Sequence, residues 1–234
     1  MNSASNKCLS SNQITALLIG VTVGPAALKL PNTLVDKVGQ DGWISAIIAL
    51  LYPLYIVLVS SYIIKKYPND NILNLSTQYF GNKVGTLLNF LFSLMFIIYL
   101  SSITSDFVRF CRIYFVYFLS PFKIIIITLI LALFTAYKGL STLGKVNELS
   151  MYLLIFITIF SISSLEHGII LNIQPVFSSS LKDIFKGSIF TTYSYSGFEY
   201  LLIIHPFAKD LNTIKKAGLK AVLIAGLIWV WSAF

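Results

Sequence analysis

A cluster of hydroxyl-bearing and aromatic residues ends in a carboxylic acid within an otherwise apolar stretch of the chain. Residues 192–199 read Thr-Tyr-Ser-Tyr-Ser-Gly-Phe-Glu. Hydrocarbon offers no hydrogen-bond partners, so a membrane-spanning helix normally avoids such a cluster. The glycine, Gly197, predicts an interruption of the helix, and backbone groups freed within a bilayer are tolerated only where they line a cavity or hold a ligand. We therefore expect this segment to form part of a binding site.

A second interruption is predicted near the start of the chain, where residues 20–26 read Gly-Val-Thr-Val-Gly-Pro-Ala. Pro25 lacks a backbone donor and clashes with the carbonyl four residues earlier, and the residue before a proline is directed away from helix. The alternative interpretation is a proline kink with small residues that let helices pack closely. Both interpretations stay open on these residues alone.

The two interruptions fall in the first and sixth predicted spans, which would open the two halves of an inverted-repeat transporter and enclose one site. Helix N-termini would direct positive dipole ends at a carboxylate, and freed carbonyls would accept an ammonium group. A zwitterionic amino acid satisfies both, and polar side chains of the third span could reach the same ligand. The expected substrate-binding residues are Gly20, Thr22, Val23, Gly24, Pro25, Tyr99, Ser102, Tyr193, Ser194, Ser196, Gly197 and Phe198.

Two ionisable residues lie within these same spans, Glu199 in the sixth and Lys29 in the first. A charged group at the centre of a bilayer costs about 2.5–3.5 kcal/mol or more, so such residues are commonly functional. We expect Glu199 and Lys29 to act in coupling or gating. The alternative for Glu199 is a structural role, hydrogen-bonded to a neighbouring helix.

The composition is that of an integral, multi-pass membrane protein built from α-helices. Of the 234 residues, 56% are hydrophobic and 11% are charged, whereas soluble domains carry about 25% charged residues. The formal net charge is +8, but the lysines stand between apolar blocks, where membrane proteins place the charges that set their orientation. This distribution argues against nucleic-acid binding and places the N-terminus on the cytoplasmic side.

Nothing in the sequence indicates catalysis. Cys8 and Cys111 lie far apart and lack the spacing of a metal site, so both are expected to be free thiols. The sequence contains no recognisable catalytic triad, phosphate-binding glycine loop or catalytic pair of carboxylates. We therefore expect no catalytic residues, no cofactor and no metal.

Apolar blocks of about 20 residues predict the membrane spans. Residues 1–13 form a polar leader expected in the cytoplasm, and 14–234 form one transmembrane, permease-like domain. Within it we expect a first five-helix repeat over about 14–165 and an incomplete second repeat over about 187–234. The last block is too short to cross about 30 Å at 1.5 Å per residue, so we expect truncation within span seven. The blocks are 14–35, 43–64, 87–119, 122–137, 149–165, 187–207 and 219–234, with a short interfacial helix at 69–86.

Several of these motifs resemble those of known permeases. The stretch from Ile19 to Pro31, followed by Gly39 and Trp43, resembles the first span of the amino acid–polyamine–organocation permeases, and residues 193–199 are similar to their sixth span. More narrowly, Gly-Gln-Asp-Gly-Trp-Ile-Ser at 39–45 and Lys-Lys-Tyr-Pro at 65–68 resemble the spore-germination permease family. These are the B-type subunits of the nutrient germinant receptors of endospore formers.

The resemblance implies an inverted-repeat permease fold with discontinuous spans one and six. It also implies a receptor subunit in the inner spore membrane that senses an amino acid or similar nutrient. The implied partners are a lipoprotein and a larger subunit with a soluble domain. Two alternatives remain: a proton-coupled amino acid permease, for which Glu199 is the motive, and a non-binding or truncated assembly subunit, suggested by the end of the sequence at Phe234.

Overall fold

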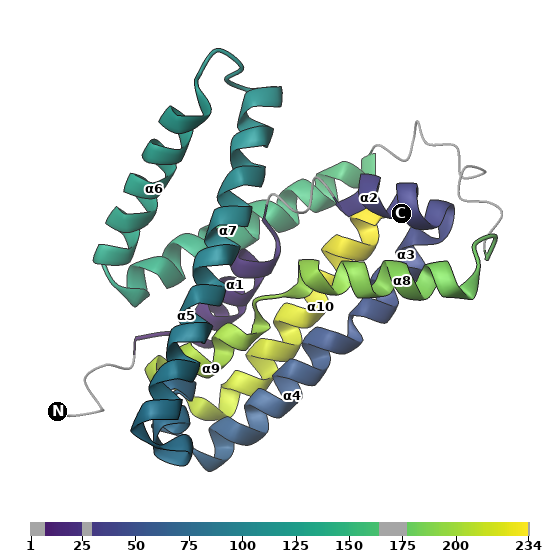
Figure 1. The fold of residues 1–234 in the computed structure, drawn as a ribbon. Helices are drawn as coiled ribbons and strands as arrows, with labels where there is room; N and C mark the ends of the chain where they lie inside the picture. Colours follow the sequence, from purple (N-terminus) through teal and green to yellow (C-terminus); the bar gives the residue numbers. More distant parts are fainter. Residues whose placement is uncertain (1–7, 25–29, 164–176, 234) are drawn as a thin grey trace.

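The structure is a computed structural model that describes residues 8–24, 30–163 and 177–233 (Figure 1). Throughout these ranges the regular structure is helical, and the one β-type pairing is an isolated bridge between Leu9 and Ala208. Four helical segments are long and apolar enough to cross a membrane, which confirms the predicted all-α membrane architecture. They are Leu30–Lys66, Ile72–Tyr114, Leu140–Ser161 and Leu211–Ala233. The last of these has 23 residues and begins before the block expected at 219–234, so its length suffices to cross a membrane, unlike that of the expected block. The division into two repeats stays a prediction.

The expected first span is divided between two helices that do not continue one another. Gly39, at φ +70°, then turns the chain between the second and third helices, so that Leu34 packs against Gly42. In the described ranges the helices are α1 (Ser11–Thr22), α2 (Leu30–Val38), α3 (Gly42–Ala49), α4 (Leu51–Lys66), α5 (Ile72–Tyr114), α6 (Pro121–Tyr137), α7 (Leu140–Ser161), α8 (Leu181–Thr192), α9 (Leu201–Ile204) and α10 (Ile214–Ala233).

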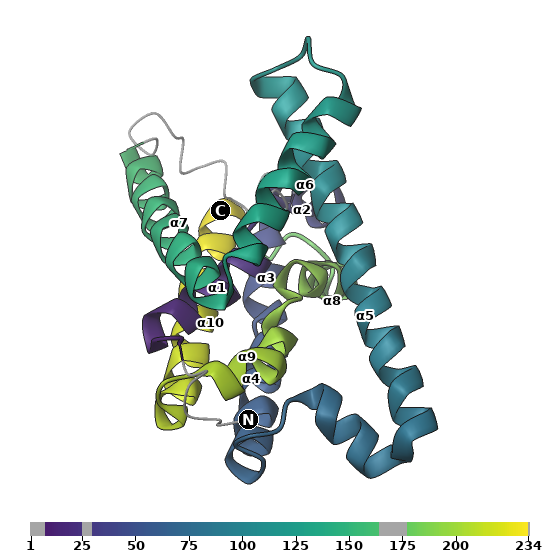
Figure 2. The same cartoon turned by 90° about the vertical axis from the view of Figure 1, so that its left-hand side faces the viewer.

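Helix α1 lies at the centre of the packed core. Every residue from Gln13 to Ile19 is buried, and α1 packs against both α7 and α10, as Figure 2 shows. The hydroxyl of Thr15 donates a hydrogen bond to Ala217 O of α10 at 3.1 Å. On its other side α10 packs against α3 and α4. The half of the first span that precedes the interruption is therefore fixed from several sides.

The chain before α1 is tied to the segment that follows α9. The backbone N–H groups of Cys8 and Leu9 donate to Phe207 O at 2.9 and 3.0 Å, and the N–H of Lys209 donates to Leu9 O at 2.9 Å. The start of the first span and the end of the sixth are thus joined by backbone hydrogen bonds.

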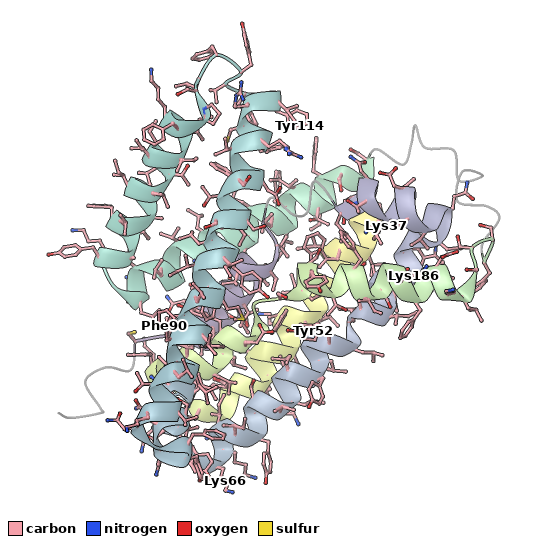
Figure 3. All side chains as sticks on the ribbon, in the orientation of Figure 1. Lys37, Tyr52, Lys66, Phe90, Tyr114 and Lys186 are labelled. Carbon is pink, nitrogen blue, oxygen red and sulfur yellow. The ribbon has the colours of Figure 1, made fainter. Side chains whose placement is uncertain are left out.

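The two ends of the bundle carry different residues. His205 Nε2 lies 3.3 Å from Tyr67 O. The residue after α4 therefore meets the segment after α9, which is bonded to Cys8 and Leu9. We call this the inner end, and it includes Lys66. The outer end includes Lys37 and Asp41, and Figure 3 shows Lys37 and Lys66 at opposite ends of the bundle. The lysine distribution predicts that the inner end faces the cytoplasm.

Helices α5 and α6 form a hairpin at the edge of the bundle (Figures 1 and 2). Helix α5 is broken at Gly81, at φ +77°, and the side chain of Asn89 donates to Leu73 O at 2.9 Å. The turns before the break therefore fold back onto the turns after it. The interfacial helix expected at 69–86 ends at this glycine, and the third span begins directly after it. Many apolar side chains of the hairpin are exposed, which is typical of a surface that contacts lipid.

The fifth span begins earlier than the apolar pattern predicts, because α7 starts at Leu140 rather than near residue 149. The polar residues between 140 and 149 are therefore not in a loop; they lie on the first turns of α7, which approach α1. A Cβ atom at Gly20 would overlap Asn147 Oδ1, and one at Gly144 would lie 3.2 Å from Gln13 Cβ. Because these turns pack closely against α1, they can be helical although their polar side chains led hydropathy to predict a loop.

Candidate functional site

The first interruption begins where α1 ends at Thr22, whose hydroxyl donates to Leu18 O at 2.9 Å. Val23 leaves the helix, with φ −94° and ψ 87°, while its N–H still donates to Ile19 O at 2.7 Å. The next described helix, α2, begins at Leu30. Two predicted site residues, Pro25 and Lys29, lie outside the described residues.

The second interruption follows α8. After Thr192 the chain makes a 3₁₀ turn over Tyr193–Tyr195, and Ser196 is then extended, with φ −62° and ψ 140°. Gly197 has φ +125°, a conformation that glycine adopts readily and residues with a Cβ do not. A second 3₁₀ turn, Phe198–Tyr200, leads into α9. The hydroxyl-rich cluster of the sequence therefore coincides with a break in regular helix.

The second interruption lies against the last turn of α1, directly before the first interruption. A Cβ atom on Gly197 would lie 2.5 Å from Val21 Cγ1 and 3.3 Å from Thr22 Cγ2, both of α1. Contacts under 3.0 Å are not tolerated without a shift of the neighbouring atoms, so the missing side chain is what permits this approach. Phe198, the next residue, is fully buried in the core, which fixes the position of the break.

Glu199 uses both oxygens of its carboxyl group at the second interruption. Oε2 accepts a hydrogen bond from the backbone N–H of Gly197 at 2.8 Å, and Oε1 accepts one from the hydroxyl of Tyr52 on α4. The side chain therefore satisfies a backbone donor that the break leaves free and links the break to a neighbouring span. In Figure 3, Tyr52 lies in the middle of the bundle, between its two ends.

A cavity of about 480 Å³ opens beside the interruptions, a size within the range typical of small-molecule sites. Its wall comes from α1, α2, α5, α8 and the turn after α8. Seven of the expected substrate-binding residues belong to this wall: Thr22, Gly24, Tyr99, Ser102, Tyr193, Ser194 and Ser196. The structure thus brings together hydroxyl groups from three segments that are far apart in the sequence.

The other expected residues that the structure describes, Gly20, Val23, Gly197 and Phe198, do not belong to the wall. Gly20 faces Asn147 of α7, and Val23 is buried. Gly197 and Phe198 hold the two interruptions together, as described above. Whether any of these residues binds a ligand stays a prediction.

Sequence reasoning did not select several residues of the wall. Phe96 and Phe190 are apolar residues in apolar spans, so no sequence pattern distinguishes them. Asp106 also belongs to the wall, and its spacing from Tyr99 and Ser102 places all three on one helical face, a signal that could have found it. In the ranges that the structure describes, no group of three or more His, Cys, Asp or Glu residues is arranged to hold a metal ion.

A buried carboxylate connects the outer parts of the two interrupted spans. Asp41, in the turn between α2 and α3, is 0% exposed. Its oxygens accept hydrogen bonds from the N–H of Phe177 at 2.7 Å, the N–H of Ser179 at 2.8 Å and the hydroxyl of Ser178 at 3.4 Å. The hydroxyl of Ser179 in turn donates to Val38 O of α2. The segment that leads into α8 is thus bonded to the end of α2.

Further contacts fix α8 along its length. Ser45 of α3 donates to Ile184 O at 2.8 Å, and Gly187 allows α8 to approach Ser45 closely. The ammonium group of Lys37 lies 3.8 Å from the centre of the Phe190 ring, a cation–π contact. Phe190 also belongs to the cavity wall. These contacts at the outer end therefore help to fix the position of Phe190 in the cavity.

The comparisons with known proteins all point to one family. The sequence profile of one family, described as spore germination protein, matches residues 8–234. Spore germination protein KB of Bacillus subtilis (strain 168) is 28% identical in an alignment that covers 94% of this chain and 60% of KB. Spore germination protein YndE of the same organism is 26% identical, covering 92% of this chain and 59% of YndE. Spore germination protein GerQB of Bacillus cereus is 23% identical, covering 95% of this chain and 62% of GerQB. The chain therefore spans about 60% of the length of these relatives, and no solved structure matches it.

Proposed function

Because the chain belongs to the spore germination protein family, we propose that it is a membrane subunit of a germinant receptor and binds a small nutrient, an amino acid, between its two helix interruptions. One observation carries the proposal: Gly197 of the second interruption lies against Val21, in the last turn of α1 before the first interruption, beside a cavity of about 480 Å³. Its partners would be the other receptor subunits, a lipoprotein and a subunit with a soluble domain, in the inner spore membrane.

Helix ends around the cavity support a zwitterionic ligand. The C-terminal ends of α1 and α8 contribute Thr22, Tyr193 and Ser194 to the wall, and helix C-termini carry partial negative charge, which attracts an ammonium group. The N-terminal end of α2 contributes Leu30 and Thr33, and helix N-termini attract a carboxylate. An α-amino acid carries both groups on one carbon atom.

The remainder of the wall favours an apolar side chain on the ligand. It contains Phe96, Leu100, Ile103 and Phe190, and burial of apolar surface contributes about 25 cal/mol per Å². We therefore expect valine or leucine to bind more tightly than aspartate or lysine.

Replacement of Tyr99 by alanine should weaken amino-acid binding roughly tenfold, since a lost hydrogen bond and lost packing together amount to about 1.4 kcal/mol. The measurement is saturable binding of tritiated L-valine and L-leucine to membranes that contain the protein. Tyr117→Ala is the matched control, because Tyr117 is 80% exposed at the tip of the α5–α6 hairpin. If none of a full panel of amino acids binds saturably, the chain is better described as a non-binding assembly subunit.

A second candidate is a proton-coupled amino acid permease, favoured by the carboxyl group of Glu199 at the interruption. The proposal of a sensing subunit predicts binding without accumulation in liposomes that hold the protein under an imposed pH gradient. Uptake well above one ligand per protein, lost in Glu199→Gln and retained in Asp36→Asn, would establish the permease instead. Asp36 is a suitable control because it is exposed on α2.

A further inference from the structure

A second cavity, of about 430 Å³, lies at the inner end, between the end of α4 and the start of α10. It is separate from the amino-acid cavity and shares no residue with it. Its wall is amphipathic, with cationic and amide side chains next to aliphatic ones. The lining residues are Ser61, Ile64, Lys65, Pro68, Leu211, Asn212, Ile214 and Lys215.

The charges of this cavity are unbalanced. Among the described residues, neither Lys65 nor Lys215 forms an ion pair. The lining residues include no acidic side chain, and Asp210, which precedes the wall in the sequence, directs one carboxylate oxygen to the N–H of Asn212 at 2.9 Å. Two ammonium groups and the Asn212 amide therefore remain as donors for an anion.

The surroundings of the cavity are those of a membrane interface. Lys65 stands in the last turn of the apolar helix α4, and Tyr62, one turn earlier, is 71% exposed; exposed tyrosines of this kind are enriched where helices leave the hydrocarbon. Pro68 is exposed and Leu211 is half-buried, so these two contribute accessible aliphatic surface beside the lysines, whereas Ile64 and Ile214 are buried. A soluble anion would use only the lysines, whereas a phospholipid would use both parts of the wall.

We propose that this cavity binds the phosphate group of an anionic phospholipid, with Lys65 and Lys215 as its two cationic contacts. Basic pockets between spans on the cytoplasmic side recognise anionic headgroups in this way. The acyl chains would follow the apolar side of the wall into the bilayer. The inference does not depend on amino-acid binding, so the two can fail separately.

The test measures the thermal unfolding midpoint of the detergent-purified protein as phosphatidylglycerol or phosphatidylcholine is added, with native mass spectrometry to count retained lipid. Phosphatidylglycerol should raise the midpoint and phosphatidylcholine should not. In Lys65→Gln/Lys215→Gln the half-saturating concentration of phosphatidylglycerol should rise roughly 30-fold, since each lysine near an anionic surface contributes about 1 kcal/mol and about 1.4 kcal/mol is tenfold.

The matched control is Lys66→Gln/Lys216→Gln, which removes the same charge from adjacent positions that do not line the cavity. It should change the half-saturating concentration less than about threefold, and Lys65→Arg/Lys215→Arg should retain the preference. Equal losses in both glutamine pairs would overturn the proposal. So would an equal midpoint shift from inorganic phosphate alone, which would indicate a soluble anion, or displacement of the lipid by hexaglutamate at matched charge, which would indicate an acidic protein partner.

Discussion

Gly197→Ala is expected to lower the free energy of unfolding by at least about 2 kcal/mol and to abolish saturable amino-acid binding. At φ +125° a residue with a Cβ is strained by about 1–3 kcal/mol. The added atom would also lie 2.5 Å from Val21 Cγ1, and overpacking of this kind costs about 1–3 kcal/mol. The measurements are the thermal unfolding midpoint in detergent and tritiated amino-acid binding.

The effect can be divided into its two causes. Val21→Ala removes the clashing methyl group, so Val21→Ala/Gly197→Ala should recover part of the lost stability, while the strain at φ +125° remains. Gly24→Ala is the matched control in the other interruption, because a Cβ there would meet no atom within 4 Å. A Gly197→Ala protein as stable as the Gly24→Ala protein would show that Gly197 does not contact the last turn of α1.

The break at Gly197 could be predicted because a spanning segment rarely contains several hydroxyl groups and a glycine together. Such a cluster stands out in a hydropathy profile, and within a bilayer it is tolerated mainly where it lines a cavity or is buried in protein. The same argument selected Tyr193, Ser194 and Ser196, and all three belong to the cavity wall. Polar residues in an apolar background thus carry much of the information about this candidate site.

The apolar part of the wall could not be predicted in this way. Phe96 and Phe190 resemble their neighbours in the sequence, and only the fold, which brings α5 and α8 to the same cavity, makes them part of its wall. Turns fixed by a positive φ are similarly hidden: nothing in the sequence distinguishes Gly81, which breaks α5, from Gly85, which packs within it. Tertiary packing determines both which apolar residues line the cavity and which glycine breaks α5.

The role of Asp41 also depends on distant residues. The sequence identifies it only as part of a family-like motif, while its hydrogen-bond partners lie 136–138 positions later in the chain. The partners are mostly backbone groups, which any sequence provides, so no pairing of residue types reveals them. The contact therefore becomes visible only in the folded chain.

Asp41→Ala is expected to lower the free energy of unfolding by about 3 kcal/mol, because it removes two hydrogen bonds from backbone N–H groups to a buried carboxylate, and hydrogen bonds to charged groups contribute about 1.5–3 kcal/mol each. The segment before α8 would then lose its hydrogen bonds to the turn after α2 and keep only the one from Ser179 to Val38 O. The measurement is the thermal unfolding midpoint, together with limited proteolysis of the segment around Ser178.

The connection from Asp41 to the cavity gives this substitution a second, separable consequence. Helix α8 carries Phe190 in the cavity wall, so release of its first turn should weaken amino-acid binding even at temperatures where the protein stays folded. Asp41→Asn, which retains one acceptor oxygen, should have an intermediate effect on both quantities. Asp36→Ala removes an exposed carboxylate from the same end of α2 and should change neither. Lost stability with unchanged affinity would mean that the outer attachment stabilises the fold without positioning the site.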